Sequence, residues 1–178
     1  DSGLLDDNVN TLKLEVYTSD NTYFTAYSYT NVDNLEITDP TKVHYNGNTN
    51  IAGNFTIKPN GKFDLSTGTI DVTGNIYFEA DATGMGQFID HGTLNVTGTS
   101  TVEEYLISER WHLVSPPIDD AQIGVYFDIY LLEFDEPTNN WNYLVLPITI
   151  PMPVTKGYYA WSDNDKIGTT TVSYTGNL

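Results

Sequence analysis

The sequence predicts an all-β protein in which a short β-solenoid, similar to a parallel β-helix, precedes an antiparallel β-sandwich-like domain. Three observations support this fold class. Short phrases of alternating apolar residues follow glycine again and again in the middle of the chain. Tyrosine, phenylalanine, threonine and asparagine are abundant, while apolar residues rarely recur at helical spacing. After about residue 102 glycine becomes scarce and aromatic residues become dense, which marks a second domain.

Residues 1–46 are expected to form N-terminal strands before the repeat begins. Leu12, Leu14 and Val16 alternate at the start of the stretch 11–30, and a polar turn follows them, so the stretch predicts a β-hairpin. The open end of a solenoid exposes unpaired backbone groups, to which another strand can add. The strand with Leu12, Leu14 and Val16 is therefore a candidate for assembly with a neighbouring subunit.

Residues 47–104 carry the repeat, most clearly in "GNFTIKPNGKFDLSTGTIDVTGNIYF", which begins at Gly53. Each phrase predicts a strand of four or five residues, and glycine is expected where the chain bends sharply. Three phrases make one coil of about twenty residues, as from Gly53 to Gly74. A short strand cannot bury its apolar face alone, whereas stacked coils bury it continuously. A sandwich of antiparallel hairpins is the alternative.

The repeat is interrupted between Gly74 and Gly92, which are 18 residues apart. We expect this stretch to form a coil with a larger excursion. Phe88 and Ile89 are then both expected to remain in the core.

Residues 105–178 predict strands joined in a Greek key or meander. The stretch 125–146 is expected to form a hairpin whose turn runs from Asp135 to Asn140, and further strands are expected at 157–161 and 169–175. In "GYYAW" both faces of the strand carry aromatic side chains. Such a strand lies in the centre of a sandwich, or one of its sides meets a partner.

The charge is strongly acidic, with 24 Asp and Glu against 7 Lys and Arg and a net charge of −17. Phosphate groups would be repelled, which excludes nucleic acid and anionic lipid as partners. The acidity could attract divalent cations or simply maintain solubility. The chain has no cysteine, which excludes disulfides and thiolate metal sites. No apolar run approaches the length of a membrane span, and the first ten residues do not resemble a signal peptide.

No catalytic signature occurs in the sequence, so we expect a protein that is not an enzyme. His44, His91 and His112 lie far apart in sequence and form no metal motif, and a G-x-S-x-G elbow and a phosphate-binding loop are missing. The enzymatic alternative, which is the third candidate, is a fragment of a polysaccharide lyase or hydrolase. It would need converging carboxylates, for which Asp64 and Asp71 are the candidates.

Calcium is the one cofactor that the sequence leaves open. Asp163 and Asp165 cluster oxygen ligands in the turn "DNDKIG", but the EF-hand spacing is not met. A solvated acidic turn is the other interpretation of these residues, and otherwise no cofactor is expected.

Exposed aromatic side chains of the C-terminal domain could bind a glycan by stacking. The candidates are Trp111, Trp141, Tyr159 and Trp161. Packing in the core is the alternative for at least half of such residues. A carbohydrate-binding module is thus the second candidate function.

The order of motifs from Gly92 onward resembles a known family. "GTLNVTGTSTVEEYL", "RWHLVSPPI", "YFDIYLLEFDEPTNNWNYL", "KGYYAW" and "VSYTGNL" follow one another. This order is similar to that in large secreted surface proteins of gliding and biofilm-forming Bacteroidetes-type bacteria, and the match covers about 47–178. There, solenoid "G-x-L-x-V" phrases lead to a "W-x-x-I-S-x-P" strand, an "N-x-W" turn and a "G-Y" strand.

The resemblance implies export, often by the type IX secretion route, and an extracellular or cell-surface location. It implies an adhesive or structural module of a surface adhesin or filament, which acts by protein or surface contact without catalysis. Partners would be further copies, neighbouring domains of the same surface protein, or a glycan or cell surface. The family has no active site to carry over. Its members usually continue with further strands and a C-terminal sorting domain, so we expect this chain to be part of a longer protein.

Overall fold

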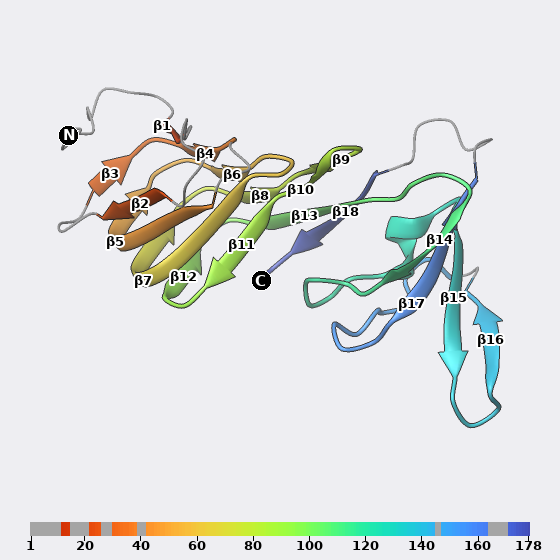
Figure 1. The fold of residues 1–178 in the computed structure, drawn as a ribbon. Helices are drawn as coiled ribbons and strands as arrows, with labels where there is room; N and C mark the ends of the chain where they lie inside the picture. Colours follow the sequence, from red (N-terminus) through yellow and green to blue (C-terminus); the bar gives the residue numbers. More distant parts are fainter. Residues whose placement is uncertain (1–11, 15–21, 26–29, 39–41, 145–146, 164–170) are drawn as a thin grey trace. The chain divides into compact units, whose positions relative to one another are not determined.

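The regular secondary structure of the described residues is almost entirely β-strand, as the sequence predicts (Figure 1). Among the described residues the one helical segment is the short 3-10 helix η1 (Ile123–Tyr126), and no helix there has the length and apolar character to cross a membrane. Contacts divide the chain into two compact units, Asp1–Thr101 and Val102–Leu178. The computed structural model describes residues 12–14, 22–25, 30–38, 42–144, 147–163 and 171–178.

The first unit is a β-solenoid of about three turns. In one sheet the strands β1, β4, β6 and β8 lie next to one another in this order and pair in parallel. The other has the order β11-β7-β5-β2, with β3 beside β5 and β12 beside β7, while β9 and β10 form a small antiparallel pair. The strands are β1 (Leu12–Leu14), β2 (Thr22–Thr25), β3 (Thr30–Val32), β4 (Leu35–Ile37), β5 (Val43–Ile51), β6 (Phe55–Ile57), β7 (Lys62–Val72), β8 (Ile76–Phe78), β9 (Ala80–Asp81), β10 (Gly84–Met85), β11 (Gln87–Asp90) and β12 (Thr93–Val96).

The register confirms the predicted coil length. Leu35 pairs with Phe55, and Phe55 pairs with Ile76, so equivalent residues lie 20 and 21 positions apart. Each coil contributes one short strand to the first sheet. To the second sheet it contributes either one long strand, β5 or β7, or two short strands, β2 with β3 or β11 with β12. The long strand β7 contains two of the predicted phrases, which meet at Gly68.

Glycine occupies the bends because neighbouring coils approach each other closely there. Gly68 has a φ of +99°, and a Cβ atom on it would lie 1.9 Å from the carbonyl oxygen of Gly47. At another bend, the amide of Gly74 donates a hydrogen bond to the carbonyl of Gly53 over 2.9 Å. The repeated glycines therefore allow one coil to stack on the next.

Aromatic rings fill the interior of the solenoid. The ring of Phe63 lies 5.3 Å from that of Phe55 and 5.9 Å from that of Phe88, measured between centroids. Phe88 thus joins this cluster, but the expectation for Ile89 is wrong, since its side chain is 38% exposed. Successive side chains of β11 point to opposite faces, so Ile89 lies on the face opposite to that of Phe88.

The predicted N-terminal hairpin is not formed. β1 pairs in parallel with β4, and β2 pairs in parallel with β5, so the two strands belong to different sheets of the solenoid. Each strand thus pairs with a strand that follows later in the chain rather than with its neighbour in sequence. Leu12 and Leu14 belong to β1, at the edge of its sheet in the described part of the chain, and Val16 lies outside that part.

Asparagine side chains connect successive coils at one bend. The amide of Asn54 donates to Oδ1 of Asn34 over 2.8 Å, and the amide of Asn75 donates to Oδ1 of Asn54 over 3.0 Å. The amide of Thr99 continues the series toward Asn75 over 2.9 Å. These side chains satisfy backbone donors that the strand pairing leaves free.

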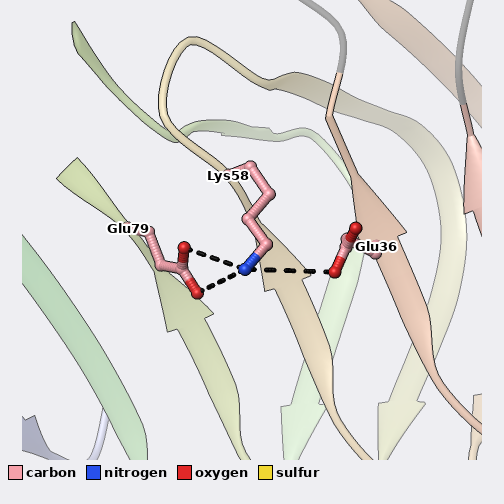
Figure 2. Close-up of polar contacts among 3 residues, drawn as sticks. All are labelled: Glu36, Lys58 and Glu79. Carbon is pink, nitrogen blue, oxygen red and sulfur yellow. Dashed lines mark hydrogen bonds and ion pairs between the residues drawn. The ribbon is translucent and has the colours of Figure 1, made fainter. Parts of the chain in front are cut away.

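Lys58 connects three successive coils beside the sheet that contains β4, β6 and β8. Nζ of Lys58 lies 2.8 Å from Oε1 of Glu79 and 3.9 Å from Oε2 of Glu36, and Figure 2 shows the lysine between the two carboxylates. All three side chains are partly exposed. The contact offsets repulsion between stacked acidic residues, but solvent screens it.

The second unit contains an antiparallel sheet of four strands in the order β14-β17-β15-β16. The predicted hairpin is confirmed in β15 and β16, which pair from Leu132 with Tyr143 to Asp135 with Asn140. Tyr126 precedes the hairpin and belongs to η1. The strands are β13 (Ser100–Tyr105, which begins in the first unit), β14 (Arg110–Val114), β15 (Tyr130–Asp135), β16 (Asn140–Tyr143), β17 (Tyr158–Ser162) and β18 (Thr171–Gly176).

Candidate functional site

One face of the four-stranded sheet is covered almost entirely by aromatic side chains. Residues paired directly across antiparallel strands point to the same face. Trp161 pairs with Trp111 on one side and with Tyr130 on the other, and Tyr159 connects β14 to β15 in the same way. We call this surface the aromatic face; it consists of Trp111, Leu113, Tyr130, Leu132, Phe134, Trp141, Tyr143, Tyr159 and Trp161.

The opposite face of the sheet is part of the core. Tyr158 and Ala160 alternate with the aromatic residues of β17 and are buried, as are Val114 on β14 and Leu131 on β15. The sheet therefore buries these four side chains on one side, while the aromatic side is open. This arrangement explains why both faces of "GYYAW" carry aromatic residues.

The aromatic face is exposed to solvent. Trp111 is 44%, Trp141 is 46% and Tyr143 is 63% exposed. Tyr159 and Trp161 are half-buried between their neighbours. The structure thus places all four residues predicted for glycan stacking on one surface, and none of the four in the buried core.

Ring contacts hold these side chains together. The centroid of Trp111 lies 5.3 Å from that of Trp161 and 5.9 Å from that of Tyr159. Tyr159 in turn lies 4.8 Å from Trp141. Because each of these rings packs against another, the positions of the side chains are fixed before any ligand binds.

Sequence reasoning did not select Leu113, Tyr130, Phe134 and Tyr143 as site residues. Their alternation was visible in the sequence, since Tyr130 and Phe134 flank Leu132 at a period of two. What the sequence could not supply was the strand order, in which β17 lies between β14 and β15.

A buried polar cluster lies in the same unit. The hydroxyl of Tyr126 donates to Oε2 of Glu104 over 3.1 Å, and the hydroxyls of Tyr126 and Tyr174 bond each other. Burial raises the pKa of Glu104 above its ordinary value, although the bonds from both tyrosines oppose this. Burial also raises the pKa of both tyrosines, so they stay protonated. The cluster ties together β13, η1 and β18.

The two carboxylates considered for catalysis have separate partners. Asp64 is buried, with Oδ2 at 3.2 Å from Nζ of Lys42 and 3.0 Å from Nδ1 of His44. Burial raises the pKa of Asp64, but its polar partners outweigh burial and lower that pKa overall. Asp71 accepts a bond from Nδ2 of Asn95 over 2.7 Å. Each carboxylate thus forms a local link between strands.

The calcium candidates are only partly described. Asp163 directly follows β17, and Asp165 lies outside the described residues. Within the described part of the chain, histidine and acidic side chains do not gather in groups of three or more that could hold a metal ion. Of the other histidines, His112 contacts the carbonyl of Ile107 through Nε2 over 2.9 Å.

The fold and the face together define an all-β chain in which a solenoid precedes a sheet with an open aromatic surface. Comparison with protein-family models, with curated proteins and with solved structures finds no match for this chain.

Proposed function

We propose that this chain is an extracellular, non-catalytic module of a bacterial surface adhesin or filament. The observation that carries the proposal is the exposed aromatic face. A contiguous apolar surface is costly to leave open to water, and such surfaces commonly mark sites of contact with a partner. Trp111 and Trp141 project from two different strands of one sheet, so a broad surface can be bound rather than a single group.

The solenoid supports the mechanical side of this proposal. Its coils are joined by backbone pairing, by stacked phenylalanines such as Phe63 and Phe88, and by the asparagine series at the bend. A stack of this kind resists bending and serves as a spacer in a surface protein. Export by the type IX route, which the family resemblance implies, belongs to the same proposal.

The test is adhesion under flow. Beads coated with the chain at equal density are passed over a layer of bacterial biofilm matrix at increasing shear. We expect the wild type to be retained and the double variant Trp111→Ala, Trp141→Ala to detach at much lower shear, because two exposed rings of the aromatic face are lost.

Phe127→Ala is the matched control. Phe127 is 63% exposed and lies at the end of η1. It borders a hollow with Tyr130 and Tyr143 but is not one of the nine residues of the aromatic face, so its removal deletes an exposed ring while the face keeps all of its side chains. This variant should be retained like the wild type. Equal retention of the double variant and the wild type would contradict adhesion through the aromatic face.

A carbohydrate-binding module is the second candidate, and one observation favours it. The four side chains Trp111, Trp141, Tyr159 and Trp161 lie on a single open sheet face, where sugar rings could stack on them. This candidate is compatible with adhesion, since a surface module can adhere by binding a glycan.

A further inference from the structure

The aromatic face contains two adjoining hollows. The larger, of about 390 Å³, has a floor that includes Leu132 and Tyr159. The smaller, of about 240 Å³, lies next to it. Both hollows are bordered by Trp111 and Tyr143; Trp141 completes the larger, and Tyr130 and Trp161 complete the smaller. A ligand with repeating rings could therefore place one unit in each hollow.

The hollows offer the two kinds of contact that a sugar ring requires. The face of an aromatic ring is electron-rich and attracts the weakly positive C–H groups on one side of a sugar. Tyr130 and Tyr143 are 51% and 63% exposed, so their hydroxyls can donate to and accept from sugar hydroxyls at the rim. A purely apolar partner would offer these hydroxyls no hydrogen bond.

Charge narrows the class of ligand. None of the nine side chains of the aromatic face belongs to Lys, Arg or His, so the face offers no cation to an acidic sugar. Residues 102–178 contain eleven acidic and three basic side chains. This excess repels uronate, sulfate and phosphate groups, and it also opposes the pairing of two copies through this face.

We propose that the aromatic face binds an uncharged polysaccharide chain, with successive sugar rings stacked in the two hollows on either side of Trp111 and Tyr143. This inference rests on the proposed adhesive function and names its ligand class. Trp111 is the central contact because it borders both hollows, whereas Trp141 and Trp161 each border one.

The test is affinity electrophoresis of the full chain in gels that contain a soluble polysaccharide. The neutral probes are a β-1,4-glucan, a β-1,3-glucan, a mannan and a xylan, and the anionic probes are polygalacturonate and alginate. We expect at least one neutral probe, and neither anionic probe, to retard the chain. Trp111→Ala should weaken that binding by about tenfold or more, as is typical when a stacking platform is removed.

Matched variants keep the result interpretable. Trp111→Phe keeps a ring and should keep most of the binding, and Phe127→Ala should bind like the wild type. Trp141→Ala and Trp161→Ala should each weaken binding less than Trp111→Ala. Because all three tryptophans lie on the aromatic face, quenching of tryptophan fluorescence by the retarding probe provides a second readout.

Three outcomes would overturn the inference. The first is the absence of retardation by every neutral probe, and the second is equal retardation of the wild type and Trp111→Ala. The third is a wild type that sediments as a dimer and a Trp111→Ala variant that sediments as a monomer, which would assign the face to a second copy. If bead adhesion still depends on the face, the adhesive function stands and only the ligand class fails.

Discussion

Phenylalanine rings fill the interior of the solenoid, whereas tryptophan and tyrosine rings cover an open face of the sheet in the second unit. Phe55 and Phe63 are almost completely buried, and both rings contact Phe88 of the next coil. Trp111 and Trp141 also contact other rings, yet nearly half of each side chain faces water. Contacts between aromatic rings therefore stabilise the core of the first unit, whereas in the second unit they organise a surface.

The physical origin of the difference lies in how each unit covers its sheets. The solenoid winds its chain around a single interior, so inward positions such as Phe55, Ile57 and Ile70 are enclosed by neighbouring coils. In the second unit the sheet is covered on the side of Tyr158 and Ala160 only. An aromatic residue on the open side of such a sheet contributes little to folding and is available for contact.

The largest predicted effect is a difference in stability between two variants, each of which lacks one aromatic ring of one unit. Phe63→Ala is expected to lower the free energy of unfolding of the solenoid by about 3–5 kcal/mol, because a buried ring is replaced by a cavity. Trp111→Ala should cost its own unit only about 1 kcal/mol, as its ring is partly solvated. Hydrogen exchange in urea, followed peptide by peptide, measures both effects. Similar losses in the two units would show that Trp111 belongs to a core rather than to an open face.

A smaller loss of stability is expected when glycine is replaced at a bend of the solenoid. Gly68→Ala should destabilise the first unit by about 3 kcal/mol, because the new Cβ would clash with the carbonyl of Gly47 and the positive φ strains any side chain. Gly157→Ala is the control, since a Cβ atom added at Gly157 would lie 3.5 Å from the nearest atom, Cδ1 of Leu113, which is an ordinary contact distance. Urea unfolding followed by circular dichroism compares the two. A midpoint for Gly68→Ala equal to that of the control would contradict the role given to the bends.

The solenoid could be predicted because its signal is local. Each glycine and the apolar pair behind it lie within five residues, and the interval from Gly53 to Gly74 gives the coil length directly. Before Gly47 this signal is missing, and the alternation at Leu12 and Leu14 is equally typical of a hairpin. Parallel pairing with a later coil is a non-local property, which explains the wrong prediction for the first strands.

The aromatic face could be predicted only in part. Trp111, Trp141, Tyr159 and Trp161 were recognisable as aromatic residues on predicted strands. Their convergence depends on β17 lying between β14 and β15, although it follows both in the chain. Many strand orders satisfy the same alternation, so pattern alone cannot choose among them.

The smallest effect concerns the buried cluster of the second unit and depends on pH. The folded pKa of Glu104 is raised above its ordinary value of 4.5, because burial disfavours the carboxylate. The folded state therefore holds the proton more tightly than the unfolded state. The stabilisation from this proton is complete below pH 4.5 and is lost as pH rises through the folded pKa.

Glu104→Gln should remove this dependence, because glutamine is neutral at every pH and can still accept the bond from Tyr126. At pH 7 the variant is expected to unfold at a slightly higher urea concentration than the wild type, and the gap should narrow toward pH 4. Tryptophan fluorescence reports this unit selectively, since all three tryptophans belong to it. Glu136→Gln removes an exposed carboxylate in the turn between β15 and β16 and should show no such trend. A gap for Glu104→Gln that stays constant from pH 4 to pH 7 would mean that the cluster holds β13, η1 and β18 by packing alone, as the phenylalanines hold the coils of the solenoid.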